Sequence, residues 1–260
     1  MQQKVTFLNS RGNKLVGILE NPTGNISTPI MLLVHGFASN KDSQSLPPLL
    51  KKLHQNKIAT FRIDLSARGE SEGRFENVTV TSDTQDVLAA IGYLKNQGYY
   101  QIGLVGSSFG GLASIMAAVG NDDVFCLVLK CPVTDWLQTH FLQKPGILEQ
   151  WNKEGFLCFE HDPSKPRMAY AAVLDAQKNI ASEVASKIKI PTLVVHGDKD
   201  EMVPYEGSHG FVKLLPNGKL HTIKGGLHHL RKNPKHSVEE NKVISEFIVR
   251  QVNHIKAMTI

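Results

Sequence analysis

Apolar residues follow two alternating patterns along most of the chain. Residues 29–34 and 58–63 form short, continuous apolar runs, which predict strands buried on both faces of a parallel sheet. Between them, leucines recur at helical spacing over residues 46–53, with Asp42 or Ser43 as the expected N-cap. Because repeated strand–helix units force the strands to run parallel, the pattern predicts a sheet covered by helices on both faces.

The rest of the chain extends this picture. Further strands are predicted at residues 101–105, 124–129, 191–195 and 219–223, and further helices at residues 87–94, 108–119, 206–215 and 243–255. The N-terminal region differs, because two strand-like runs at residues 4–8 and 14–19 flank the turn sequence Ser10-Arg11-Gly12-Asn13. Such a turn between two strands predicts a β-hairpin.

The alternation stops between residues 132 and 185. This segment holds both tryptophans and four further aromatic residues, namely Trp136, Phe141, Trp151, Phe156, Phe159 and Tyr170. A loop of this length without structure of its own is uncommon in a compact domain. We therefore expect a single α/β domain over residues 1–260, in which residues 132–185 form a cap insertion above the sheet.

The composition is that of a folded globular protein. Hydrophobic residues make up 41% of the 260 residues and charged residues 20%. No apolar stretch reaches the roughly 18 residues of a membrane span, and the first residues lack the apolar core of a secretory signal. Cys126, Cys131 and Cys158 are odd in number and unpatterned, which favours reduced thiols. We expect a cytoplasmic protein with no membrane span.

The charge and the histidines each argue against one class of function. The formal net charge of +5 is spread over both halves of the chain, without the basic run or stripe that a phosphate backbone requires. We therefore expect no nucleic-acid partner. The histidines show no zinc-ligand spacing such as H-E-x-x-H, so no metal is implied. The sequence carries no signal for a particular oligomeric state.

A candidate nucleophile lies in residues 106–110, GSSFG, which match the pattern G-x-S-x-G around Ser108. The pattern follows a predicted strand and opens a helix of small residues, the strand–turn–helix setting of a nucleophile elbow. A sharp turn there lifts the serine hydroxyl out of the sheet, and the glycines let neighbouring backbone approach closely. The simpler alternative is a glycine-rich turn that only joins a strand to a helix.

Two later segments offer the partners that a serine nucleophile needs. A serine hydroxyl reacts well only when a base takes its proton and an acid orients that base. HGDKDEMVP at residues 196–204 and KGGLHH at residues 224–229 each follow a predicted strand. Because open α/β sheets form their sites at the carboxyl ends of strands, we expect these segments to meet Ser108. The first segment offers two candidate acids and the second offers two candidate bases, and the spacing does not decide between them.

Together these motifs resemble the α/β-hydrolase superfamily over nearly the whole chain. The resemblance is strongest to the serine-hydrolase branch of the feruloyl and cinnamoyl esterases and their monoacylglycerol-lipase-like and acyl-peptidase-like relatives. The residues that carry it are LVHGF at 33–37, RIDL at 62–65, RGESEG at 68–73, GSSFG at 106–110, HGDKDEMVP at 196–204 and GGLHH at 225–229. The chain order Ser, Asp, His is also that of these enzymes. The resemblance implies an α/β-hydrolase fold and a serine hydrolase that needs no cofactor.

The resemblance also implies individual catalytic roles. Ser108 would be the nucleophile. Asp200, which precedes the Val-Pro pair, would be the acid, with Asp198 as the alternative. His228, three residues after a glycine, would be the base, with its neighbour His229 as the alternative.

The tetrahedral intermediate of such a reaction needs hydrogen-bond donors where its oxyanion forms. The elbow predicts the backbone N–H of Phe109 as one donor. The resemblance implies the residue after His-Gly, Phe37, as the second, so that His35 shapes the loop and is not a base. Five residues are expected to brace this loop, namely Arg62, Asp64, Arg68, Gly69 and Ser71, with an arginine that binds a substrate carboxylate as the alternative.

The substrate class depends on the predicted cap. An aromatic-rich insertion over a catalytic face favours an apolar acyl or aryl pocket that includes Trp136, unless the aromatic residues only pack the cap onto the sheet. The resemblance to cinnamoyl esterases implies that Tyr170 or Asp135 contacts a phenolic hydroxyl.

We therefore expect hydrolysis of a small-molecule carboxylic ester, of short-chain acyl or aryl type, through an acyl-enzyme intermediate. A thioesterase, an acyl-peptidase or an acyltransferase would use the same triad. A non-catalytic ligand-binding protein of the same fold is the alternative from another class.

Overall fold

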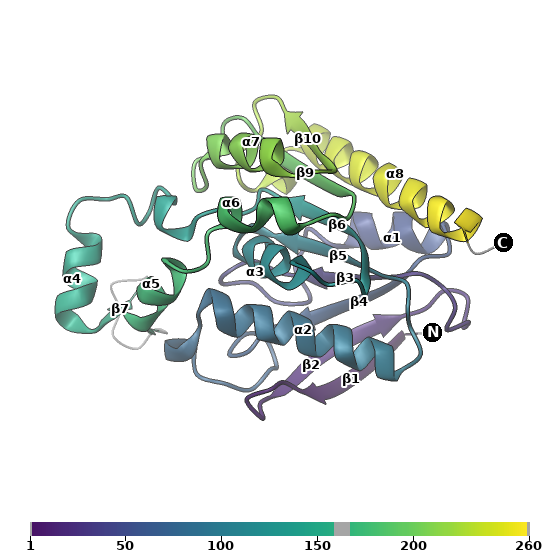
Figure 1. Ribbon diagram of the computed structural model, residues 1–260, viewed down its shortest axis with the longest axis horizontal. Coiled ribbons are helices and arrows are strands. Elements are labelled where there is room, and N and C mark those ends of the chain that lie inside the picture. The colour runs from purple at the N-terminus through teal and green to yellow at the C-terminus, as the bar shows by residue number, and fades with distance from the viewer. Residues whose placement is uncertain (1, 159–166, 259–260) are drawn as a thin grey trace.

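A computed structural model of the protein describes residues 2–158 and 167–258. Eight strands form one sheet in the order β1-β2-β4-β3-β5-β6-β9-β10 (Figure 1). They are β1 (Gln2–Leu8), β2 (Lys14–Glu20), β3 (Ile30–Val34), β4 (Ala59–Asp64), β5 (Ile102–Ser107), β6 (Val124–Lys130), β9 (Thr192–Gly197) and β10 (Gly218–Ile223). β1 and β2 pair antiparallel, as do β2 and β4, and the strands from β4 to β10 pair in parallel. The predicted hairpin and the predicted parallel sheet are both present.

Helices cover both faces of this sheet (Figure 1). They are α1 (Pro47–Gln55), α2 (Val80–Asn96), α3 (Ser108–Ala118), α7 (Tyr205–Leu214) and α8 (Pro234–Met258), with the short 3₁₀ helices η1 (Phe75–Asn77), η3 (Ala185–Lys187) and η4 (Leu230–Lys232). Successive residues of a strand point to opposite faces. In β3, Leu32 therefore packs in the core under α2 and α3, and Leu33 packs in the core under α1 and α8. The fully buried strand explains the continuous apolar run in the sequence.

The predicted N-cap of α1 is wrong. The helix begins at Pro47, and its N-cap is Leu46, which makes no side-chain capping bond. Proline suits the first helical turn because its missing N–H has no acceptor there. Asp42 lies earlier in the loop and pairs with Lys41 at 3.1 Å, and Ser43 bonds Ser45 at 3.1 Å between hydroxyl oxygens.

Between β6 and β9 the chain leaves the sheet and forms small elements. These are η2 (Trp136–Gln138), α4 (Ile147–Glu154), β7 (Phe156–Cys158), β8 (Arg167–Ala169), α5 (Ala171–Ala176) and α6 (Ala181–Val184). α4, β7 and α5 lie at one end of the molecule, and α6 returns to the layer of α3 and α7 (Figure 1). Trp151 is fully buried here and donates its indole N–H to the carbonyl oxygen of Met168 at 2.9 Å. Residues 159–166 of the predicted cap, Phe159 among them, lie outside the described residues.

Among residues 2–158 and 167–258, none of the helices combines the length and the apolar character that a membrane crossing demands.

Candidate active site

Ser108 occupies a strained turn between β5 and α3. Its φ angle is +52°, in the left-handed region that side chains other than glycine rarely adopt. A neighbouring glycine makes the turn possible: a Cβ atom on Gly110 would overlap the carbonyl oxygen of His35, on the loop after β3. The strand–turn–helix geometry therefore presents the Ser108 hydroxyl at the carboxyl edge of the sheet, next to that loop.

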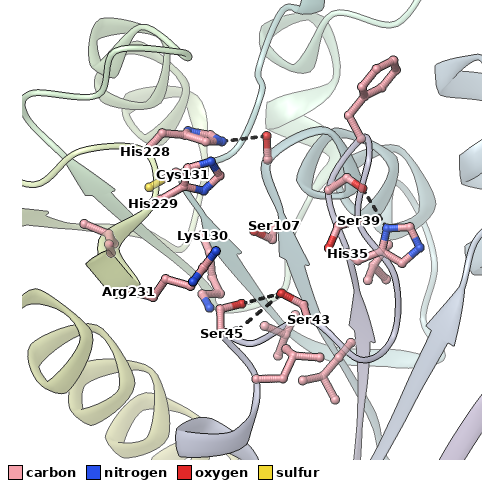
Figure 2. Close-up of a pocket in the computed structure, with 18 of the residues that line it drawn as sticks. His35, Ser39, Ser43, Ser45, Ser107, Lys130, Cys131, His228, His229 and Arg231 are labelled. Atoms are coloured by element: carbon pink, nitrogen blue, oxygen red, sulfur yellow. Dashed lines mark hydrogen bonds between the residues drawn. The ribbon is translucent and has the colours of Figure 1, made fainter. Parts of the chain in front are cut away.

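The structure brings Ser108, His228 and Asp200 into one hydrogen-bonded series. The Oγ atom of Ser108 lies 3.0 Å from Nε2 of His228, and Figure 2 shows this ring directed into the pocket. Nδ1 of His228 lies 2.7 Å from Oδ2 of Asp200. Because a carboxylate only accepts hydrogen bonds, the neutral ring carries its proton on Nδ1 and offers the lone pair of Nε2 to the serine hydroxyl.

The Asp200 carboxylate is buried and fully engaged. Oδ1 accepts the backbone N–H groups of Met202 and Val203, each at 2.9 Å. Oδ2 accepts His228 and also His196, whose Nε2 lies at 2.9 Å. Burial alone would raise the pKa of Asp200, but the hydrogen bonds from the two imidazoles hold that pKa well below its usual value. Asp200 is therefore ionised at neutral pH.

The structure also shows where the alternative residues lie. Asp198, the alternative acid, accepts the backbone N–H of Gly225 at 2.6 Å and so closes the loop that carries His228. His229, the alternative base, is exposed, and its ring centroid lies 5.3 Å from that of His228. Of the two candidate acids, Asp200 belongs to the hydrogen-bonded series that begins at Ser108, and of the two candidate bases, His228 does.

The loop after β3 lies directly against the nucleophile. A Cβ atom on Gly36 would come within 3.2 Å of Cβ of Ser108, so a glycine lets the two backbones meet. Phe37, next along this loop, packs its ring 5.6 Å from that of Phe109, between centroids. The N–H of Phe109 lies in the first turn of α3, where helix geometry supplies no intrahelical acceptor. The two predicted oxyanion donors thus sit on facing segments.

His35 shapes the loop that carries Phe37. Its Nδ1 donates to the carbonyl oxygen of Gly36 at 2.7 Å, and its Nε2 accepts the N–H of Leu65 at 3.1 Å. Burial, followed by the positive charge of Arg68, lowers the pKa of His35 to about 4. The imidazole is therefore neutral, and both ring nitrogens are used within the loop.

Asp64 and Gly69, two of the residues predicted to brace the same loop, do so. Asp64 is fully buried and accepts the backbone N–H of Lys41 at 2.7 Å, the Lys41 ammonium at 3.0 Å and the N–H of Glu70 at 2.9 Å. A Cβ atom on Gly69 would overlap that carboxylate. Arg68 forms a buried ion pair with Asp83 of α2, so its guanidinium is bound within the fold.

A cavity of about 440 Å³ opens beside Ser108 and His228. Its wall continues through the loop after β3 to Lys130 (Figure 2) and Glu240. These two residues form a buried ion pair, 3.3 Å long, that joins β6 to α8. The three predicted substrate residues of the cap, namely Trp136, Asp135 and Tyr170, are not part of this wall.

The three cap residues take up other positions. Trp136 is buried and packs on Phe109, with ring centroids 5.1 Å apart, so it joins the segment between β6 and β9 to the turn that carries Ser108. Asp135 accepts the N–H of Leu137 at 3.0 Å and caps η2. Tyr170 lies against Trp151, 6.4 Å between ring centroids. Their predicted contacts with a substrate stay a prediction.

Sequence reasoning missed two residues that the site uses, Lys41 and His196. Lys41 has no motif of its own, because it lies in the loop after β3 and its partner Asp64 lies at the end of β4. His196 stands four residues before Asp200 in the segment HGDKD and could have been found from its place at the end of β9.

One cluster of side chains has the composition of a metal site. Ligand atoms of Cys131, His196 and Asp200 all lie within 4.8 Å of one another. Hydrogen bonds account for this geometry, since His196 is bonded to Asp200 through one ring nitrogen and to Ser208 through the other.

Comparison with known proteins places the chain in a family. Residues 72–254, which include Ser108, Asp200 and His228, match the prolyl oligopeptidase family. The chain belongs to this family. Among its relatives, the mitochondrial palmitoyl-protein thioesterase ABHD10 of Bos taurus is 28% identical over 218 residues, which cover 82% of this chain and 68% of that protein. A 31.7 kDa protein of Escherichia coli is 30% identical over 233 residues, covering 76% of this chain and 81% of that one.

Solved structures of other proteins share the fold. Est1E from Butyrivibrio proteoclasticus, solved with bound ferulic acid, is 26% identical and superposes with a TM-score of 0.81, over 96% of this chain and 99% of its own. The monoacylglycerol lipase of Paleococcus ferrophilus is 20% identical, with a TM-score of 0.72 over 96% of this chain and 99% of its own. The predicted α/β-hydrolase fold and its suspected relatives are thereby confirmed, and the chain is a hydrolase of this fold.

Proposed function

We propose that the chain hydrolyses a carboxylic ester through a covalent acyl-enzyme on Ser108. The observation that carries this proposal is the unbroken hydrogen-bond series from Ser108 through His228 to Asp200, with lengths of 3.0 and 2.7 Å, at the wall of a cavity. A serine, a base and an orienting acid in this order are what acyl transfer requires.

The first step of the proposed reaction forms the acyl-enzyme. Ser108 Oγ attacks the ester carbonyl while Nε2 of His228 takes its proton. The oxyanion faces the backbone N–H groups of Phe37 and Phe109. When the bond to the leaving alcohol breaks, His228 gives its proton to the alcohol oxygen, and Asp200 stabilises the imidazolium between the two transfers.

The second step returns the enzyme to its starting state. A water molecule attacks the acyl carbonyl, and His228 takes a proton from that water. The second tetrahedral intermediate collapses, the bond to Ser108 Oγ breaks, and His228 returns the proton to the serine. These steps leave a carboxylic acid and use no cofactor.

The acyl group is proposed to be a short chain or an aryl group of cinnamoyl type. The support is an aromatic cluster beside the nucleophile, in which the ring of Trp136 lies 6.1 Å from Phe37, 5.1 Å from Phe109 and 6.0 Å from Trp151, between centroids. The ferulic acid bound to Est1E supports an aryl acid in particular. Residues 132–185 act as the cap in this proposal, with Tyr170 or Asp135 meeting the phenolic hydroxyl.

A thioester is the second candidate substrate class. The observation in its favour is the similarity to the palmitoyl-protein thioesterase ABHD10. A thioester would use the same three residues, with a thiol as the leaving group, so rates on matched oxygen and sulfur esters of one acyl group distinguish the two.

Initial rates on p-nitrophenyl esters from acetate to laurate, on methyl ferulate and on an acyl thioester would test the proposal, with Ser108→Ala measured in parallel. Turnover that depends on Ser108 and is faster on the oxygen esters supports it. Faster turnover of the thioester supports the second candidate, and transfer of the acyl group to an added alcohol supports an acyltransferase. Absence of turnover on every compound contradicts both and favours peptides or a binding role.

The place of action is proposed to be the cytoplasm. Cys126, Cys131 and Cys158 are all free thiols, and two of them are buried. Free thiols are typical of a reducing compartment. Fractionation of cells that express the protein tests this, and recovery in an organelle, as the name of mitochondrial ABHD10 states for that relative, contradicts it.

A further inference from the structure

Asp200 is shared by two imidazoles, and only one of them has a role in the proposed reaction. His228 approaches Oδ2 of Asp200 with Nδ1 at 2.7 Å, and His196 approaches the same oxygen with Nε2 at 2.9 Å. His196 lies at the end of β9 with its side chain fully buried. Its other ring nitrogen, Nδ1, lies 2.7 Å from the hydroxyl oxygen of Ser208, a fully buried residue of α7.

These contacts fix the tautomer of a neutral His196 ring. The Asp200 carboxylate can only accept, so the proton of a neutral His196 lies on Nε2 and points at Oδ2. Nδ1 then holds a lone pair, which the hydroxyl of Ser208 can satisfy as a donor. Every buried polar atom of the arrangement is paired in this one tautomer, whereas the other tautomer would place two lone pairs face to face.

We propose that His196 is a positioning residue of the triad: it holds the Asp200 carboxylate in place and draws negative charge from the oxygen that faces His228, and Ser208 fixes its tautomer. This inference rests on the proposed function, because it assigns His196 a part in that reaction. His196 acts through Asp200 and touches neither the substrate nor Ser108.

The charge on Oδ2 links His196 to the behaviour of His228. A hydrogen bond from His196 disperses negative charge that would otherwise stabilise the His228 imidazolium. Loss of this donor leaves more negative charge on Oδ2 and so favours the His228 imidazolium, which moves the acid limb of the pH–rate profile to higher pH. A histidine that merely filled space would affect folding without moving this limb.

Other titratable groups also face this cluster. They are Cys131 at the end of β6, Glu201 and His229 in the flanking loops, Tyr205 on α7, and the Lys130–Glu240 pair between β6 and α8. Burial raises the pKa of the Cys131 thiol well above its usual value, so the thiol is neutral at the pH of the assay. Glu201 accepts the backbone N–H of His228 at 3.0 Å and remains in every variant described below.

The tautomer can be measured in the unaltered protein without any turnover. In protein labelled with ¹⁵N-histidine, the nitrogen shifts of His196 should show a neutral ring protonated on Nε2, with its N–H proton shifted downfield and slow to exchange. His228 should show the opposite tautomer, protonated on Nδ1. A His196 ring protonated on Nδ1, or one that averages between tautomers, would overturn the proposal even if the enzyme is active.

Variants test the effect on catalysis. His196→Leu removes the donor and should lower kcat on a p-nitrophenyl ester by about 10- to 100-fold, the effect of one hydrogen bond to a charged group. Its acid limb should move to higher pH. His196→Gln can place a side-chain N–H near the position of Nε2 and should recover part of both effects. His221→Leu is the matched control, since His221 also bonds a carboxylate, Glu239, at 2.8 Å, on the surface of β10.

The outcomes distinguish a failure of the positioning role from a failure of the proposed hydrolase function. A folded His196→Leu protein with unchanged kcat and acid limb overturns the positioning role and leaves the hydrolase standing. If His196→Leu does not fold, Ser208→Ala takes its place: the freed Nδ1 should let the ring sample both tautomers, with a smaller change of the same sign. A Ser208→Ala protein that keeps the wild-type profile and tautomer also overturns the proposal. Failure of the proposed function itself would appear as turnover that Ser108→Ala does not remove.

Discussion

The carboxyl edge of the sheet and the segment between β6 and β9 are each stabilised by a different kind of interaction. At the edge, short hydrogen bonds and backbone contacts fix each group: Ser108 meets His228 at 3.0 Å, and Asp200 accepts four donors. In the segment, aromatic rings pack on one another, as Trp136 and Trp151 do at 6.0 Å between centroids. Hydrogen bonds impose one geometry, whereas apolar packing tolerates several. The edge is suited to chemistry, and the proposed function assigns the selection of substrates to the segment.

The largest effect expected from this comparison is at the edge. Ser108→Ala removes the proposed nucleophile and little packing, so kcat/KM for p-nitrophenyl esters should fall by about 10⁴-fold or more while Tm stays close to that of the wild type. Initial rates and a thermal melt measure the two quantities. Ser182→Ala, at an exposed position of α6, is the control and should change neither. A Ser108→Ala enzyme within tenfold of the wild type would refute the assignment.

A smaller but still large effect is expected from a single methyl group at the turn. Gly110→Ala would drive a Cβ atom into the carbonyl oxygen of His35, and we expect a loss of about 3 kcal/mol in the free energy of unfolding. Gly210→Ala, in α7, is the matched control because nothing lies within 4 Å of its new Cβ atom. It should stabilise the helix by about 0.5–1 kcal/mol. Urea unfolding measures both, and equal effects would contradict the close approach at the edge.

The buried His35 predicts how the edge responds to acid. Burial and the charge of Arg68 lower its pKa from 6.5 to about 4 in the folded protein. Between these pH values the unfolded chain binds a proton that the folded protein does not, so stability is complete above pH 6.5 and falls as the pH drops toward 4. We expect His35 to account for about 1–3 kcal/mol of this fall.

Urea unfolding at a series of pH values measures this contribution. His35→Asn is less stable at neutral pH but should show a shallower fall between pH 6.5 and 4, because no imidazole remains at this position. His54 and His229 also have lowered pKa values and contribute to the slope in both proteins. An identical slope in the two proteins would show that His35 does not resist protonation.

The smallest effect is expected in the segment between β6 and β9. Tyr170→Phe or Asp135→Asn should reduce the discrimination between hydroxylated and plain cinnamates by about 3- to 10-fold, the effect of losing or weakening one hydrogen bond. Rates on p-nitrophenyl acetate should stay unchanged, since acetate has no phenolic hydroxyl. Tyr100→Phe, at a tyrosine 74% exposed, is the control. If both variants keep the wild-type discrimination, the phenolic contact is refuted.

The sequence predicts the edge far better than the segment, for a physical reason. A strained serine turn needs glycines around it, and the ends of parallel strands bring separated motifs together, so Ser108, Asp200 and His228 leave a readable pattern. The choice between His228 and His229 depends on which ring turns toward Ser108, a fact of the loop conformation that residue types do not encode. Lys41 left no signal because the position of its partner, Asp64, is set by the pairing of β4 with β2.

The segment between β6 and β9 was harder to predict because its elements are short. β7 and β8 have three residues each and α6 has four, too few for an apolar period to emerge. The start of α1 was also predicted wrongly from residue types alone. Asp42 and Ser43 are good capping residues, but the prolines at the first turn set the start of the helix at Pro47, and neither residue caps it.

Labelling with a fluorophosphonate tests the central claim most directly, because the reagent needs an activated serine and no knowledge of the substrate. After reaction of the folded protein, intact mass and peptide mapping should show one adduct, on Ser108. Ser108→Ala should remove the adduct, and His228→Gln should slow its formation by orders of magnitude, since the base that activates the serine is gone. An unlabelled Ser108 in folded protein, or equal labelling of the Ser108→Ala variant, would contradict the account.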